Sequence, residues 1–233
     1  MNPMKLLSIR PFASAAASAA LVVSATGAAL LLPAPLTAQT AAGPAMAGPV
    51  MANQGDLASA VTALRAITTM RADFIQTDRN GRQVKGVLTL KRPGKIRFQY
   101  QQGVPMLIVS DGGALTFVDY EVRQVQRWPI KNSPLGALLD PNRDVMKFGK
   151  QVPSGNPQVV SVEVRDKKHP EYGVITLVFI RRPGAPGGLE LSSWASLDSQ
   201  NNRTVVSLTN QQYGITLPDN AFRYKDPRIP VRR

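Results

Sequence analysis

The chain has 233 residues, of which 43% are hydrophobic, and it carries a formal net charge of +13 and no cysteine. The length suits one large domain or two small ones; no internal repeat is visible, and we favour a single domain. The 18 glycines and 19 prolines favour a turn-rich β protein over a helical bundle. The absence of cysteine excludes a disulfide framework, a thiolate metal site, a cysteine nucleophile and lipid modification at a cysteine.

The positive charge is spread along the chain in ones and twos, as in Lys91-Arg92 and Arg181-Arg182. No recognition helix or RNA-binding aromatic signature accompanies it, so we expect no nucleic-acid partner. Docking to acidic protein surfaces and attraction to anionic lipid headgroups are both compatible with this charge.

Residues 1–38 have the pattern of an export signal. Lys5 and Arg10 precede an uncharged run that ends in small residues near Ala38. A retained membrane anchor is the alternative, because the run is long enough to span a bilayer, but its many Ala and Ser residues are only weakly apolar. We expect residues 39–54 to form a disordered leader, and residues 55–233 to form the single domain of a periplasmic protein.

A helical pattern follows from Asp56, which suits an N-cap. Leu57, Val61 and Leu64 fall on one stripe, which predicts an amphipathic helix with a single face to cover.

From Met70 the period of the pattern changes to two, and Asn80-Gly81 is a strong hairpin signal. The chain then reads as an antiparallel meander of roughly ten strands at the spacing of a barrel or sandwich. After the strand that starts at Met70, the expected strands cover residues 83–91, 95–100, 106–110, 115–120, 122–128, 159–165, 174–180, 189–197 and 203–213.

Arg92 lies at the end of one strand, just before a Pro93-Gly94 turn. Because successive side chains of a strand point to opposite faces, Arg92 shares an apolar face with Leu88 and Leu90. A guanidinium at the rim of such a face must find an acceptor or reach water. This position therefore suggests a switchable latch.

A short helix interrupts the meander. Ser133 can cap it and Pro134 suits its first position, while Leu135, Leu138 and Leu139 line one side. A helix this apolar should lie across a face of the sheet. The residues therefore predict a mainly β fold, a barrel or a sandwich, with two amphipathic helices to plug or cover it.

We find no catalytic constellation. The single histidine, His169, lies in a charged turn between strands, where no base with an orienting partner is indicated. The sequence also lacks a nucleophile elbow, a HExxH metal pattern and a glycine-rich phosphate loop. We therefore expect a binding protein, with neither enzymatic activity nor a metal or other cofactor.

What it binds depends on whether the shell is hollow. Strand alternation would line a cavity with Leu88, Leu90, Ile96 and Phe98, but the same pattern fits an ordinary filled core.

Four stretches in a fixed order resemble the periplasmic outer-membrane lipoprotein carrier family, which is called LolA-like. They are residues 71–76 (RADFIQ), 86–98 (GVLTLKRPGKIRF), 108–112 (IVSDG) and 133–139 (SPLGALL). The resemblance implies an open antiparallel β-barrel, or half-barrel, in which helices form a lid over a concave apolar face that holds the acyl chains of a lipoprotein. It also implies that Arg92 bonds the backbone of the lid when the carrier is closed and lets go when cargo enters.

On this resemblance the chain accepts acylated outer-membrane lipoproteins from an inner-membrane ATP-driven releasing transporter and delivers them to an outer-membrane receptor. The lid helix would carry Leu57, Val61 and Leu64. The cavity would be lined by Phe74, Leu88, Leu90, Ile96, Phe98, Tyr100, Ile108, Leu135, Leu138 and Leu139.

Three other functions were weighed. The related receptor is itself a lipoprotein, and the absence of cysteine excludes it. A carrier of a different lipid and a non-catalytic structural module of the envelope both remain open, because acyl chains present the same surface and a filled core gives the same periodicity. A monomer is the default assembly.

Overall fold

The computed structural model describes residues 54–130, 136–139, 145–198 and 200–228. The expected signal, almost all of the expected leader, and Ser133, Pro134 and Leu135 lie outside these residues.

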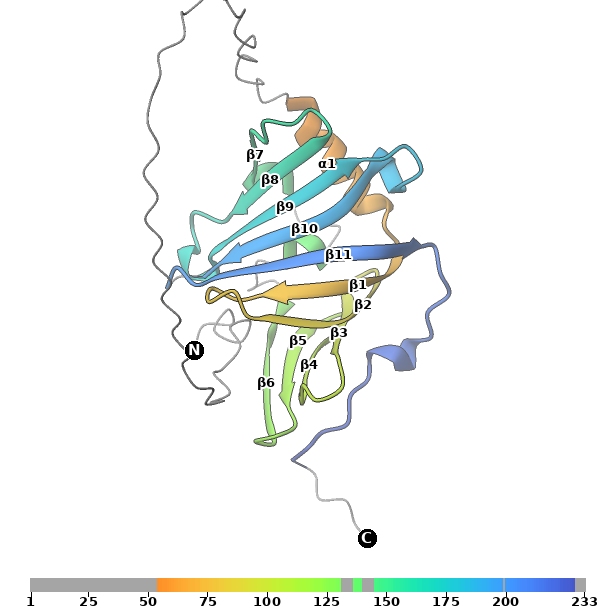
Figure 1. Ribbon diagram of the computed structural model, residues 1–233, viewed down its shortest axis with the longest axis vertical. Helices are drawn as coiled ribbons and strands as arrows, with labels where there is room; N and C mark the ends of the chain where they lie inside the picture. The colour runs from red at the N-terminus through yellow and green to blue at the C-terminus, as the bar shows by residue number, and fades with distance from the viewer. Residues whose placement is uncertain (1–53, 131–135, 140–144, 199, 229–233) are drawn as a thin grey trace, which may run out of the picture. The chain divides into compact units, whose positions relative to one another are not determined.

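Eleven strands form one antiparallel sheet in the order β6-β5-β4-β3-β2-β1-β11-β10-β9-β8-β7 (Figure 1). No pairing joins β6 to β7, so the sheet is open, and the predicted open antiparallel architecture is confirmed. The strands are β1 (Thr69–Thr77), β2 (Gln83–Lys91), β3 (Lys95–Tyr100), β4 (Met106–Asp111), β5 (Ala114–Asp119), β6 (Gln124–Pro129), β7 (Gly149–Val152), β8 (Val159–Arg165), β9 (Val174–Arg181), β10 (Leu189–Leu197) and β11 (Arg203–Tyr213).

The alternating pattern decides which side chains face the core. In β3 the side chains of Ile96, Phe98 and Tyr100 are buried, whereas Arg97 between them is partly exposed. Short turns with glycine in the left-handed region connect many of the strands, and Gly81 at the predicted hairpin has a φ of 78°. The strand β7 was not predicted, which makes the count eleven rather than about ten.

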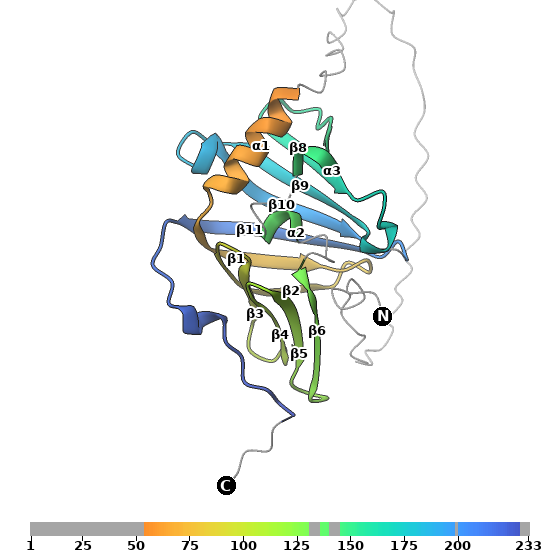
Figure 2. The ribbon, with the colours of Figure 1, turned by 180° about the vertical axis from the view of Figure 1, so that it is seen from behind.

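Three helices lie on the same side of the sheet (Figure 2): α1 (Gln54–Ala66), α2 (Gly136–Leu139) and α3 (Val145–Phe148). The prediction that Asp56 caps α1 is wrong, because the helix begins two residues earlier, at Gln54. Asp56 instead lies in the first turn, where a carboxylate still interacts favourably with the helix dipole.

The main core lies between the sheet and the helices. It joins inward residues of the strands to Val61 and Leu64 of α1 and to Leu138 and Leu139 of α2. Leu57 is only partly buried and packs against this cluster.

Three 3₁₀ helices complete the described chain: η3 (Pro170–Tyr172), η4 (Pro186–Gly188) and η5 (Asp219–Phe222). His169, which precedes η3, lies in the turn between β8 and β9 as predicted. Its ring is half exposed, and Nδ1 lies 3.1 Å from Oε1 of Glu171.

Candidate lid and apolar binding face

The residues predicted to line a cavity lie together on one face of the sheet, beneath the helices. Their exposed fractions do not exceed 5%. Those that the structure describes are Phe74, Leu88, Leu90, Ile96, Phe98, Tyr100, Ile108, Leu138 and Leu139, and all belong to the main core cluster. Leu135 lies outside the described residues.

Aromatic rings form one part of this face. The ring of Phe74 packs edge to face against Phe98 and Tyr100, with centroid distances of 5.5 and 5.4 Å. Phe98 packs in the same way against Trp194 of β10, at 6.1 Å. These contacts link strands on both sides of the central strand β1.

Arg92 joins the two helices that cover the apolar face. Its Nε donates to the backbone oxygen of Ile67, just after α1, at 2.7 Å. Its Nη1 donates to the backbone oxygen of Leu139, the last residue of α2, at 3.4 Å. The sequence predicted that Arg92 needed an acceptor at this rim, and the acceptors are carbonyls at two helix ends.

The turn after Arg92 holds α2 by a second contact, in which the backbone N–H of Gly94 donates to the same oxygen of Leu139 at 3.0 Å. Gly94 has a φ of 69°, and a Cβ at this position would lie 2.7 Å from the backbone oxygen of Gly112. Ser110 Oγ donates to the backbone oxygen of Gly94 at 2.7 Å. Only glycine fits this turn without displacing a neighbouring strand connection.

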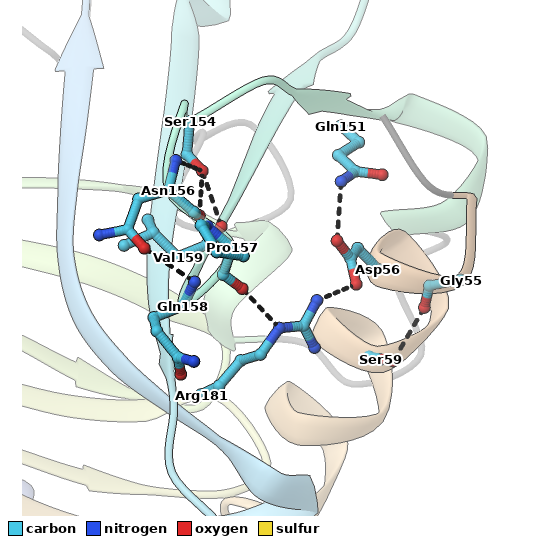
Figure 3. A network of polar contacts seen from close by, with 10 residues as sticks. All are labelled: Gly55, Asp56, Ser59, Gln151, Ser154, Asn156, Pro157, Gln158, Val159 and Arg181. Atoms are coloured by element: carbon cyan, nitrogen blue, oxygen red, sulfur yellow. Dashed lines mark hydrogen bonds and ion pairs between the residues drawn. The ribbon is translucent and has the colours of Figure 1, made fainter. Parts of the chain in front are cut away.

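At its other end α1 is held by the α1 clasp, which we define as Asp56, Gln151, Pro157 and Arg181 (Figure 3). The guanidinium of Arg181 bonds the carboxylate of Asp56, and its Nε donates to the backbone oxygen of Pro157 at 3.0 Å. Gln151 Nε2 donates to Asp56 Oδ2 at 2.9 Å. The clasp therefore ties the first turn of α1 to β7, to β9 and to the loop before β8.

Close packing supports α1 between its two ends. A Cβ placed on Gly187 of η4 would lie 2.8 Å from the Cα of Ala63. The absence of a side chain at Gly187 thus lets the loop between β9 and β10 approach the helix backbone.

One hydrogen-bonded pair lies within the apolar face. The hydroxyl of Tyr100 donates to Oε1 of Gln76 at 2.8 Å, and the exposed fractions of these residues are 5% and 1%. Burial raises the pKa of the Tyr100 hydroxyl, so the group is a neutral donor.

The chain that follows β11 packs on the opposite face of β3 to β5. Phe222 of η5 contacts a second core cluster with Leu107, Val109 and Val118. Asp219 pairs with Lys91 and Lys95, each at 2.9 Å. We call residues 217–224 the C-terminal strap.

Sequence reasoning missed the α1 clasp, the Gln76–Tyr100 bond and the strap. Their partners lie 24 to 128 positions apart, and no local pattern connects them. The register of the strands carried a partial signal, because alternation already placed Gln76 on the same face as Phe74.

Among the described residues, no group of three or more His, Cys, Asp or Glu side chains is placed to hold a metal ion. Within the same part of the chain, none of the helices combines the length and apolar character needed to cross a bilayer.

Comparison with known proteins identifies the family. Residues 65–225 match the family described as outer membrane lipoprotein carrier protein LolA. An outer-membrane lipoprotein carrier protein of Nitrosospira multiformis is 39% identical over 169 residues, which cover 68% of this chain and 79% of the relative. One from Dechloromonas aromatica is 28% identical over 188 residues, which cover 77% of this chain and 88% of the relative.

Among solved structures, a LolA superfamily protein from Nitrosomonas europaea aligns with a TM-score of 0.42 and 10% identity, over 73% of this chain and 97% of that one. The chain belongs to the family of outer membrane lipoprotein carrier proteins.

Proposed function

We propose that this protein carries acylated lipoproteins across the periplasm, with the acyl chains held on the apolar face beneath α1 and α2. The observation that carries the proposal is the pair of hydrogen bonds from Arg92 to the backbone oxygens of Ile67 and Leu139. One side chain thereby fastens both helices over a large apolar surface.

The free energy of acyl transfer explains why a carrier is needed. At about 0.8 kcal/mol per buried methylene, a sixteen-carbon chain loses on the order of 12 kcal/mol on entering water. Unassisted passage through an aqueous compartment is therefore negligible. A carrier need only offer contacts that approximately replace those of the membrane.

The latch works because its bonds are weak relative to that burial. Hydrogen bonds from a charged donor such as Arg92 contribute roughly 1–3 kcal/mol. Acyl chains that enter the face compensate for the loss of these bonds, and the helices close again when the cargo leaves. Arg92 thus biases the equilibrium between open and closed states without trapping the cargo.

The family supplies the proposed route. The names of the relatives describe lipoprotein carriers, which supports acylated outer-membrane lipoproteins as the cargo. The proposed donor is an inner-membrane ATP-driven releasing transporter, and the proposed acceptor is an outer-membrane receptor. The role needs no catalytic group, and the N-terminal segment would act as a cleaved signal.

The test replaces Arg92 by Leu and follows a triacylated lipoprotein from the loaded carrier to the purified receptor. Arg92→Leu should still load cargo, but it should transfer the cargo at least about tenfold more slowly, because loss of about 1.4 kcal/mol of bias toward the closed state corresponds to that factor. Arg127→Leu is the matched control, since Arg127 is exposed and its ion pair is with the side chain of Asp111 rather than with the backbone of a helix end. Equal transfer rates for the two variants would refute the latch, and failure of the wild-type protein to bind any acylated lipoprotein would refute the carrier.

A further inference from the structure

The Gln76–Tyr100 bond lies at the end of the apolar part of the inward face, beyond which buried Thr204 and Ser196 continue the same side of β11 and β10. Gln76 shares the inward side of β1 with Ala72 and Phe74, and Tyr100 shares that of β3 with Ile96 and Phe98. A face built only to bury hydrocarbon gains nothing from a hydroxyl and an amide, since each costs free energy unless it is paired.

The strand register places this pair at the far end of the face from Arg92. Lys91, next to Arg92, pairs with Thr69 at the start of β1, whereas Gln76 pairs with Val84 near the start of β2. Tyr100 pairs with Gly86, which also pairs with Phe74. Between Arg92 and Gly86 the inward positions of β2 are Leu88 and Leu90, both fully buried.

The end of the face is also rigid. A Cβ on Gly86 would lie 2.6 Å from Cε1 of Phe74, so the Phe74 ring already rests on the backbone of β2 and cannot move closer. Tyr100 packs edge to face against that ring, and its hydroxyl bonds Gln76. The ring, the hydroxyl and the amide therefore form a wall.

We propose that the Gln76–Tyr100 pair closes the far end of the acyl-binding face and sets the longest acyl chain that this carrier accepts. The inference rests on the proposed function and specifies its substrate. A chain that extends past the pair must break its hydrogen bond or bury the hydroxyl and the amide against hydrocarbon, and both are unfavourable.

The strand geometry gives the expected length. The six steps along the chain from Gly86 of β2 to Arg92, the residue after this strand, span about 20 Å at about 3.3 Å per residue. Carbon–carbon bonds of about 1.5 Å at tetrahedral angles advance an extended chain by about 1.25 Å per carbon. The face therefore holds about sixteen carbons between the latch and the wall.

The test measures affinity for synthetic lipopeptides that share one peptide and carry acyl chains of about twelve to about twenty carbons. For the wild-type protein, each added methylene should tighten binding about fourfold until the chain has about sixteen carbons, after which the gain should stop. In the double variant Gln76→Leu/Tyr100→Phe, affinity should continue to rise for at least about two more methylenes. The longer chains should then bind the variant about fifteenfold more tightly than the wild type. Tyr120→Phe, which removes an exposed tyrosine hydroxyl after β5, is the matched control and should keep the wild-type limit.

The outcomes distinguish failure of the length limit from failure of the proposed function. A double variant that melts like the wild type but keeps the same length limit overturns the proposal, as does a wild-type series with no limit. If the double variant does not fold, Tyr100→Phe alone should raise the limit by at least one methylene, and an unchanged limit again overturns the proposal. If no acylated peptide binds the wild type, the proposed function itself fails, and the length limit fails with it.

Discussion

The carboxylate of Asp56 bonds the guanidinium of Arg181, although the two residues lie 125 positions apart in the chain. This contact fixes the first turn of α1, while the last turn runs through only Ile67 and Thr68 into β1. Arg92 holds the same junction through the oxygen of Ile67 and through its own backbone N–H, which donates to the oxygen of Thr68 at 2.8 Å. Release of the Arg92 side chain would leave α1 held by the clasp and α2 held by the bond from the Gly94 N–H to Leu139, so it loosens this junction without detaching either helix.

Charge reversal tests the α1 clasp. Asp56→Arg and Arg181→Asp should each lower the free energy of unfolding by about 1–2 kcal/mol and speed amide exchange in the first turns of α1, because each variant places like charges together. The double variant should recover most of the lost free energy of unfolding, because the ion pair is restored with its charges exchanged. Gln151 Oε1 has no described partner and can accept a hydrogen bond from the new arginine at position 56. Urea denaturation and hydrogen exchange measure both effects, and additive losses in the double variant would contradict the clasp.

Gly94→Ala should destabilise the latch turn. A Cβ there both adopts an unfavourable φ of 69° and collides with the backbone of Gly112, so we expect a loss of about 2–4 kcal/mol. Gly81→Ala is the comparison, because Gly81 has a φ of 78° but no atom within 4 Å of the added Cβ. Gly81→Ala should lower the free energy of unfolding by only about 1 kcal/mol. Equal losses for the two variants in urea denaturation would show that contact with Gly112 is unimportant.

The hold of Asp219 on the C-terminal strap should weaken in acid. Hydrogen bonds from Lys91 and then Lys95 lower the pKa of Asp219 from its ordinary value of 3.8 to about 2. A carboxylate whose pKa is lowered on folding stabilises the fold above its ordinary pKa, and that contribution disappears as the pH falls through the lowered value. The contribution of Asp219 to holding the strap should therefore be complete above about pH 4 and should be lost as the pH approaches 2.

An NMR titration of the Asp219 carboxyl carbon measures this pKa directly. In Lys91→Met/Lys95→Met the midpoint should move up toward 3.8, because both donors are gone. A midpoint that stays near 2 in this variant would show that other groups hold the charge.

Trp194 should report cargo binding. The sequence has two tryptophans, so Trp128→Phe leaves Trp194 as the single fluorophore. Trp194 is 1% exposed and packs on Phe98 in the apolar face. The emission of Trp194 should be blue-shifted in the free protein. It should change in proportion to occupancy when a triacylated lipopeptide binds, and the deacylated peptide should have no effect. Saturable lipopeptide binding with constant emission would place the acyl chains elsewhere.

The sheet could be predicted well because most of its strands bury one face. Strict alternation gave the observed limits of β2, β8, β10 and β11. The four-residue strand β7 and the four-residue helix α3 are too short for any period to stand out. The start of α1 was misplaced because Gln54 and Gly55 are not apolar, so the stripe that marks the helix cannot reveal them.

The candidate site could be predicted only in part. The inward side of β2 and the rim position of Arg92 follow from alternation, and the family resemblance supplied the idea of a lid. The resemblance predicted the lid backbone as the acceptor of Arg92, but the particular carbonyls could not be predicted, because the backbone oxygens of Ile67 and Leu139 look the same in sequence as any others. Eight strands (β1 to β8) and two α-helices separate Asp56 from Arg181 in the chain, and the two residues meet only because the sheet order brings them back together.

The open sheet has two edges, and unpaired edges invite another chain to add a strand. The edge strand β7 has only four residues, and β6 carries Arg127 and ends in Pro129, which lacks a backbone N–H to donate. Charge, shortness and proline are the features that discourage edge-to-edge pairing. An open sheet with such edges is thereby protected against edge-to-edge polymerisation, and each copy is expected to work alone.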